Sequence, residues 1–308
     1  MNNDQTSVDV VIPSYRPDEK FSRLVKKLQE QEYPIGTIFV INTKAGRFPK
    51  EVEQMEKVKV YHIERREFDH GATRDMGMQM SKAEIVVFMT QDAVPADEYV
   101  IGNLVKVLEE DEMTGAAYAR QLAASDCNYI EKYTRKFNYS ENSRIKSKED
   151  LQEMGIKTFF CSNVCAAYKR NIYEKAGGFC KKTIFNEDMI LAGHMINAGY
   201  KVAYVAEARV IHSHNYTGMQ QFHRNFDMAV SQAEHPEVFD GIKSENEGIK
   251  LVKQTAAHLV KQRKIYMVPK LVYQSGCKYI GYRMGKMYKK LPDKVVKWCS
   301  MSPGYWEK

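Results

Sequence analysis

The sequence predicts an α/β protein in which a mostly parallel sheet carries helices on both faces. Short apolar runs rich in β-branched residues alternate with segments of helical periodicity through the first half of the chain. Polar residues follow each apolar run directly, as they do where parallel strands end at a ligand site. The 308 residues are 44% hydrophobic and 28% charged, which is typical of a globular protein and argues against disorder.

The first strand is expected at Val8–Ile12, where a β-branched run stops at Pro13. Residues 18–31 follow with apolar side chains at helical spacing, which predicts an amphipathic helix. The order of elements in this half predicts parallel strands with helical connections. The remaining elements, in chain order, are strands at Ile38–Asn42 and Val58–Ile63, a helix at 72–81, a strand at Ile85–Thr90 and a helix at Asp97–Glu110.

Formal charge is divided unevenly along the chain, whose net value is +7. Residues 243–308 hold 15 Lys and Arg against 4 Asp and Glu, a net of +11, and residues 1–242 carry a net of −4. A basic tail on an acidic body fits an anionic membrane surface at least as well as it fits nucleic acid. Two regions are therefore expected, a catalytic domain at 1–226 and a basic amphipathic helical region at 227–308.

Several ordinary features point to a cytoplasmic protein. No uncharged apolar run approaches the roughly 18 residues that span a bilayer, and the N-terminus lacks the pattern of a signal peptide. The six cysteines form no CxxC pair and are expected to be reduced. Neither GxGxxG nor GxxxxGK[ST] occurs, so a nucleotide would be bound by side chains and a metal rather than by a glycine loop.

Asp92 ends the fourth apolar strand and precedes a turn that contains Pro95. A carboxylate fixed at the mouth of the sheet could bind a divalent cation that bridges a diphosphate, because hard cations prefer oxygen ligands. The alternative is a cap for the following helix, and this residue alone does not decide between the two.

An acid pair and a histidine pair stand out in the second half. Glu187 and Asp188 follow Asn186, the expected N-cap of a helix at Met189–Ala198; they could complement the helix dipole or supply a general base. His212 and His214 follow a short strand at Arg209–Ile211 and face the same way if the chain is extended. Either imidazole could complete a metal site, or the two could form a hydrogen-bonded surface pair.

Taken in order along the chain, these features resemble the GT-A glycosyltransferases of family 2, over roughly residues 7–226. GT-A is a Rossmann-like fold with a mostly parallel sheet, and the basic helical region would follow it. The resemblance is closest to bacterial rhamnosyltransferases that use dTDP-L-rhamnose. It rests on four stretches, FDHGATRDMG at 68–77, MTQDAVP at 89–95, FNEDMILAGHMINAGYKVAYV at 185–205 and VIHSHNYT at 210–217.

The resemblance implies a role for each matching residue. Asp188 matches the catalytic base, with Glu187 beside it. Asp92 matches the last acid of the metal-binding DxD motif, although Thr90 replaces the first, and His212 or His214 matches a metal-binding histidine; Mg²⁺ or Mn²⁺ is the implied cofactor. The residues implied in binding the nucleotide sugar are Pro13, Ser14, Tyr15, Asn42, His70, Gly71, Arg74, Gln91 and Asp92.

The implied activity is an inverting transfer of a sugar from a dTDP-sugar donor to a saccharide acceptor during cell-wall or surface polysaccharide synthesis. A lipid-linked acceptor at the inner face of the plasma membrane would explain the basic tail, which is expected to bind anionic lipid. A helical pair packed on the core with solvated basic faces is the competing interpretation of that tail.

Two other classes of protein compete with this reading. A sugar-nucleotide nucleotidyltransferase should carry a glycine- and basic-rich loop after the first strand, and Pro13–Lys20 contains no glycine. A non-catalytic nucleic-acid-binding protein could use the basic tail, but that tail contains no recognisable RNA- or DNA-binding module. We therefore expect no nucleic-acid partner.

Overall fold

The computed structural model describes residues 5–242 and 245–307, and these divide into two compact units. The first unit comprises the described part of residues 1–124 together with 139–182 and 187–212. The second comprises residues 125–138, 183–186 and the described part of 213–308. The predicted boundary between residues 226 and 227 lies inside a continuous helix, and it stays a prediction.

The first unit is built on one mixed sheet whose strand order is β3-β2-β1-β4-β8-β6-β9-β5, with β7 paired to β9. Strands β1, β2, β3 and β4 run parallel to one another, as the sequence predicts, and β8 then runs antiparallel to both β4 and β6. The strands are β1 (Val8–Tyr15), β2 (Ile38–Thr43), β3 (Val58–Ile63), β4 (Ile85–Met89), β5 (Val94–Pro95), β6 (Thr114–Leu122), β7 (Arg144–Lys146), β8 (Cys165–Lys169) and β9 (Lys201–Ile211).

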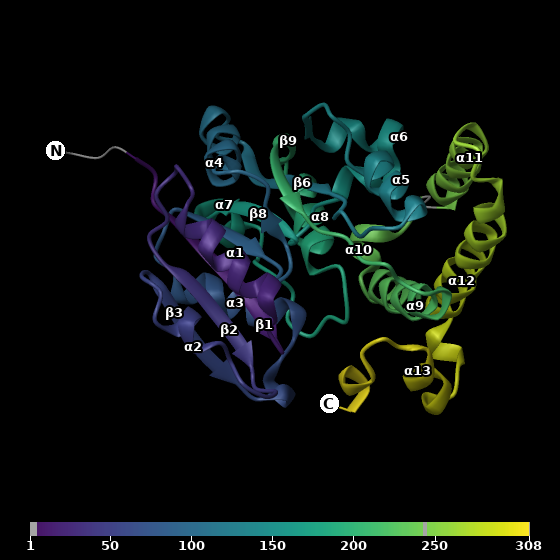
Figure 1. Cartoon of the computed structure of the whole chain (residues 1–308), viewed down its shortest axis with the longest axis horizontal. Helices are drawn as coiled ribbons and strands as arrows, with labels where there is room; N and C mark the ends of the chain where they lie inside the picture. The colour runs from purple at the N-terminus through teal and green to yellow at the C-terminus, as the bar shows by residue number, and fades with distance from the viewer. Residues whose placement is uncertain (1–4, 243–244, 308) are drawn as a thin grey trace. The chain divides into compact units, whose positions relative to one another are not determined.

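Helices cover both faces of this sheet, which confirms the predicted α/β class (Figure 1). On one face, Val10 of β1 and Val87 of β4 share a core with helices α1 and α4. On the other face, Phe88 of β4 packs edge-on against Phe179, whose ring in turn contacts Tyr173 of α7. The α-helices of this unit are α1 (Glu19–Gln29), α2 (Lys50–Glu53), α3 (His70–Met80), α4 (Val100–Glu110), α6 (Leu151–Met154), α7 (Arg170–Lys175) and α8 (Glu187–Asn197).

Strand β1 continues past Pro13, where the sequence led us to expect its end. The pairing of β1 with β4 stops at Val11, but its pairing with β2 runs on to Tyr15. The N–H of Val10 points to the β2 side, so the nitrogen of Pro13, three residues on, faces the β4 side where the ladder has ended. Proline is tolerated there because no partner requires its missing N–H.

The second unit is helical in its described residues. Its α-helices are α5 (Tyr129–Asn138), α9 (Gly218–Glu234), α10 (Pro236–Phe239), α11 (Glu245–Lys261), α12 (Val268–Lys286) and α13 (Asp293–Cys299). Pro269 lies in the first turn of α12 and Pro292 caps α13, so both prolines begin helices as they are expected to. The short 3₁₀ segment η4 (Ile265–Met267) joins α11 to α12.

Two glycines allow α12 to pack closely on α9 (Figure 1). A Cβ atom at Gly281 would lie 2.2 Å from the carbonyl oxygen of Phe222, and one at Gly285 would lie 2.3 Å from that of Phe226. The GxxxG pattern in the tail is thus a helix-packing motif inside this unit. Within the described residues, no helix is long and apolar enough to cross a membrane.

Candidate active site

The carboxyl ends of three strands in the first unit bring the predicted nucleotide-binding residues together. Ser14 donates to the side-chain oxygen of Asn42 over 3.0 Å, which links the ends of β1 and β2. The backbone N–H and C=O of Tyr15 bond to the amide of Gln91 over 2.8 and 3.0 Å, which ties β1 to the turn after β4. These four residues, together with Pro13 of β1, form a polar edge of the sheet. Asp92 directly follows Gln91 at this edge.

Asp92 and His212 meet at this edge, although they are far apart in the sequence. The Nε2 atom of His212 lies 3.5 Å from an oxygen of Asp92, and its Nδ1 atom lies 3.1 Å from the side-chain oxygen of Gln121. With Nδ1 donating to Gln121, the lone pair of Nε2 points toward the carboxylate. A second group that orients the imidazole in this way is typical of metal-binding histidines.

The residues at this position fit a divalent cation. An imidazole beside a carboxylate suits Mn²⁺ better than Mg²⁺, which prefers a shell of oxygen ligands. Among the described residues, the hydroxyl of Thr90, two positions before Asp92, is buried and has no hydrogen-bond partner, so an unused oxygen lies nearby in the chain. Asp92 and His212 therefore form a candidate metal site, and His214 lies two residues further on, where the chain has passed into the second unit.

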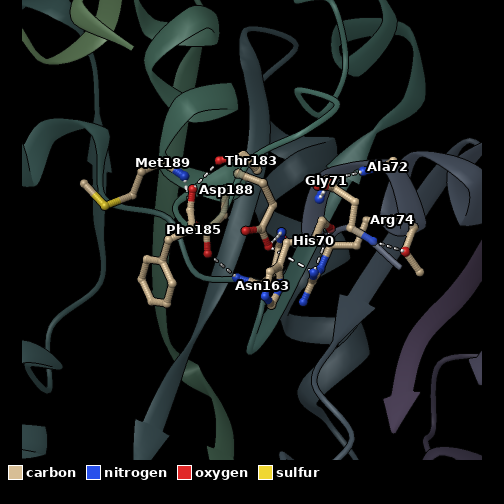
Figure 2. A network of polar contacts seen from close by, with 12 residues as sticks. His70, Gly71, Ala72, Arg74, Asn163, Thr183, Phe185, Asp188 and Met189 are labelled. Carbon is tan, nitrogen blue, oxygen red and sulfur yellow. Dashed lines mark hydrogen bonds and ion pairs between the residues drawn. The ribbon is translucent and has the colours of Figure 1, made fainter. Parts of the chain in front are cut away.

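Glu187 opens α8 as part of a buried ion pair. One of its oxygens lies 3.1 Å from a guanidinium nitrogen of Arg74, and both side chains are almost completely buried. The same guanidinium nitrogen donates to the carbonyl of His70 over 2.9 Å (Figure 2). Burial acts to raise the pKa of Glu187, but the charges of Arg74 and His70 outweigh it and hold that pKa below its usual value.

Asp188, the predicted base, lies beside this ion pair and accepts a hydrogen bond from the backbone N–H of Asn163 over 2.9 Å (Figure 2). Burial, and next the negative charge of Glu187, raise the pKa of Asp188 to about 7. A carboxyl with such a pKa is a much stronger base than a solvated aspartate and is still partly ionised at neutral pH.

Helix α3 supplies the remaining predicted residues, His70, Gly71 and Arg74. The side chain of Asp69 caps the helix by accepting from the N–H groups of Gly71 and Ala72 over 3.0 and 2.9 Å (Figure 2). The cap fixes the first turn and so directs the carbonyl of His70 at Arg74. The guanidinium of Arg74 is engaged with Glu187 here, and its predicted role toward a diphosphate stays a prediction.

Sequence reasoning missed two residues, Asn163 and Gln121, that hold the predicted ones in place. Asn163 donates its side-chain amide to Glu187 over 3.2 Å and accepts from the hydroxyl of Tyr168 over 2.8 Å. Gln121, on β6, orients His212. The stretch Ser162-Asn163 is polar within an apolar segment, which is a signal that could have marked it, but nothing in the sequence places it against α8.

This site combines a partly buried candidate base of raised pKa, a candidate cation site and a polar strand edge, which together suit transfer of a group from an anionic donor to a hydroxyl. The protein-family model described as "Glycosyl transferase family 2" matches residues 9–177, which is more than half of the chain. The chain belongs to this family, and it is a glycosyltransferase.

Curated relatives match almost the whole chain. The O-antigen chain rhamnosyltransferase RfbN of Salmonella typhimurium is 36% identical over 304 residues, which cover 97% of this chain and 96% of RfbN. The O-antigen chain rhamnosyltransferase WbaN of Salmonella anatum is 34% identical over 305 residues, with the same coverage.

Solved glycosyltransferases share the fold at low sequence identity. The mannosyltransferase PcManGT from Pyrobaculum calidifontis, solved with GDP-Man and Mn²⁺, superposes with a TM-score of 0.59 at 15% identity and covers 98% of this chain and 85% of its own. TarS 1–349 of S. aureus superposes with a TM-score of 0.53 at 10% identity, and the match covers 92% of this chain and 91% of the TarS chain. These likenesses confirm the predicted GT-A fold.

Proposed function

We propose that the protein is an inverting rhamnosyltransferase that moves L-rhamnose from dTDP-L-rhamnose to a saccharide acceptor in surface polysaccharide synthesis. The full-length similarity to two O-antigen rhamnosyltransferases supports the sugar. The observation that carries the reaction type is the acid pair at the start of α8, where Asp188 has a pKa near 7 beside an ion-paired Glu187.

In the proposed reaction, Asp188 takes the proton of an acceptor hydroxyl. The hydroxyl oxygen attacks the anomeric carbon of the donor and forms the new glycosidic bond, while the bond from that carbon to the diphosphate breaks. The diphosphate leaves with the bonding electron pair. A single displacement from the opposite face inverts the anomeric carbon, so no covalent sugar-enzyme intermediate is required.

The polar strand edge would hold the donor nucleotide. Ser14, Tyr15, Asn42 and Gln91 offer donors and acceptors for the base and ribose, with Pro13 fixing the strand end between them. His70, Gly71 and Arg74 on α3 would flank the diphosphate. Asp92, with His212 and His214, would hold Mg²⁺ or Mn²⁺, which supplies a Lewis acid for the departing diphosphate.

The proposal extends to the place of the reaction. A saccharide acceptor linked to a lipid would lie at the inner face of the plasma membrane, and the net charge of +11 on residues 243–308 suits a negatively charged leaflet. The protein would then work as a peripheral enzyme bound through its C-terminal region, with 1–226 as the catalytic domain.

A nucleotide screen tests the donor. We expect dTDP with Mn²⁺ to raise the melting temperature of the protein more than UDP or GDP with the same metal, because ligand binding stabilises the folded state. Transfer of label from dTDP-L-rhamnose, but not from UDP- or GDP-sugars, completes the test. A preference for GDP or UDP would contradict the proposed donor while leaving the family unchanged.

The variant Asp188→Asn tests the base. The amide keeps the shape of the side chain but cannot accept the proton, so turnover should fall by about 10²-fold or more while dTDP binding stays within a few-fold of wild type. Glu19→Gln, an exposed acid in the first turn of α1, is the matched control and should keep full activity. Retained turnover in Asp188→Asn would remove this residue from the role of base.

A further inference from the structure

Large apolar side chains are exposed along η4 and one side of α12; one of them, Tyr273, has its ring against Gly218 of α9. Five others lie on the outer side. They are Ile265 (65% exposed), Tyr266 (71%), Val272 (61%), Tyr279 (57%) and Ile280 (54%), and we call them the outer ridge. Scattered exposed apolar residues are ordinary on protein surfaces, but residues gathered on one helix face mark an interaction surface.

The outer ridge lies on the opposite side of α12 from its packed face. Leu271, Gln274, Gly281 and Gly285 are the buried residues of this helix, and the two glycines contact α9. At 100° per residue, the buried set centres about half a turn away from Val272, Tyr279 and Ile280. The ridge is therefore not needed to hold α12 on α9, and its apolar character calls for another partner.

The charge around the ridge restricts that partner. Residues 248–292 contain 11 Lys and Arg and no Asp or Glu. Lys261, Arg263 and Lys270 are exposed near η4, and Lys289 and Lys290 are exposed just beyond α12. A surface that is both apolar and cationic matches an anionic lipid bilayer, where aromatic and aliphatic side chains enter the headgroup region and basic ones meet the phosphates.

We propose that the outer ridge is the lipid-docking face of this protein, with Ile265 and Tyr266 inserting at η4 and α12 lying along the headgroups of an anionic bilayer. This rests on the proposed membrane location of the enzyme and names the face that serves it. A second copy of the chain is a poorer occupant, because two such faces would bring like charges together. Nucleic acid is poorer as well, because Tyr266 and Tyr279 could stack on bases but the aliphatic Ile265, Val272 and Ile280 could not.

Vesicle flotation with the full chain tests the ridge. We expect the wild-type protein to float with vesicles of phosphatidylcholine and phosphatidylglycerol and to stay behind with phosphatidylcholine alone. Raising the salt concentration should weaken but not abolish the binding, because screening removes the charge attraction and leaves apolar insertion. Equal flotation with neutral vesicles, or none with anionic ones, would overturn the proposal.

Point variants separate the ridge from the general charge of the tail. Tyr266→Ser with Tyr279→Ser should weaken binding to anionic vesicles by about tenfold or more, since both side chains are exposed and their loss does not disturb the packing. Tyr99→Ser removes a tyrosine that is 49% exposed in the first unit and should bind like wild type. Equal weakening in both variants, or in neither, would count against the ridge.

Two further readouts distinguish this proposal from the proposed function and from a protein partner. The double variant should transfer rhamnose at the wild-type rate to an acceptor dispersed in detergent. If the wild-type protein floats but transfers no rhamnose, lipid docking by the outer ridge is supported and the proposed donor is rejected. If it transfers rhamnose but does not float, the donor is supported and lipid docking by the ridge is rejected. A wild-type dimer in sedimentation velocity that the double variant turns into a monomer, with no flotation by either, would assign the face to a second copy and overturn lipid docking.

Discussion

At the scale of single residues, the surroundings of Asp188 determine how the reaction should depend on pH. Its pKa is about 7 because loss of solvation and the charge of Glu187 both raise it, and the proposed base must be ionised to accept a proton. The rate should therefore rise with pH up to about 7 and level off above it, whereas an ordinary aspartate would give a level rate from about pH 5. Single-turnover rates measured between pH 5 and 9 check this, and a flat profile would exclude the raised pKa.

Asn163 gives a second residue-scale prediction, because it contacts both acids. The variant Asn163→Asp places another carboxylate next to Glu187 and Asp188, and like charges favour the protonated form. The rise of the rate should move to higher pH by roughly one unit, with a lower rate at pH 7. Asn142→Asp, an exposed position in the first unit, is the control and should leave the profile where it is. An unmoved profile in Asn163→Asp would mean that this side chain does not tune the base.

The same residues indicate how far the sequence could predict the site. Asp92 and Asp188 each stand where a regular apolar element ends or begins, but acids are common at the start of helices, and it is the resemblance to family 2 that gives both residues a role. Asn163 and Gln121 cannot, because they matter only through β8 and β6, whose places beside β4 and β9 come from pairings between distant segments. Local pattern and the family resemblance indicate the proposed reacting groups, and long-range topology supplies the groups that orient them.

At the scale of elements, the contact of α9 with α12 gives a prediction that separates packing from helix propensity. Gly281→Ala would place a methyl group 2.2 Å from the carbonyl of Phe222, so the helices must move apart. We expect a loss of about 2 kcal/mol or more and a lower melting temperature. Gly276→Ala, on the same helix, adds a Cβ with no neighbouring atom of the described residues within 4 Å, and it should instead gain up to about 1 kcal/mol from helix propensity. Calorimetry of both variants is the measurement, and equal effects would contradict the close packing.

Elements were predicted unevenly for a physical reason. The strands and helices expected within residues 8–110 follow their own hydrophobic periodicity, and the structure places them within a few residues of the expected bounds. The short elements α2 and β5 in the same range were not expected. Asn186 behaves differently from its expected role as an N-cap. It takes a left-handed φ of 63° and its amide donates to the carbonyl of Met228, so a contact distant in sequence sets its conformation. The helices of the tail were recognisable, but their arrangement depends on which glycines meet a neighbouring backbone.

At the scale of the whole molecule, the two units have separate hydrophobic cores. The core beneath the sheet, around Val10, Phe21 and Val87, draws only on the first unit. A cluster around Phe222, Phe226 and Val296 belongs to the second, together with Cys277 and Met284. The proposed base and most proposed donor contacts lie in the first unit, so nucleotide binding should depend mainly on that core.

This separation predicts the behaviour of a chain that ends after residue 242. It keeps the whole first unit and α9, but it loses α11, α12 and α13, and the last two of these helices cover Phe222 and Phe226. The exposed apolar face of α9 should make the truncated protein self-associate, which size-exclusion chromatography would detect. Because the first core is intact, dTDP with Mn²⁺ should still raise the melting temperature of what remains soluble. A monomeric truncated protein with full transferase activity would mean that the basic region only carries the enzyme to its membrane, and that its helices contribute nothing to the stability of the body.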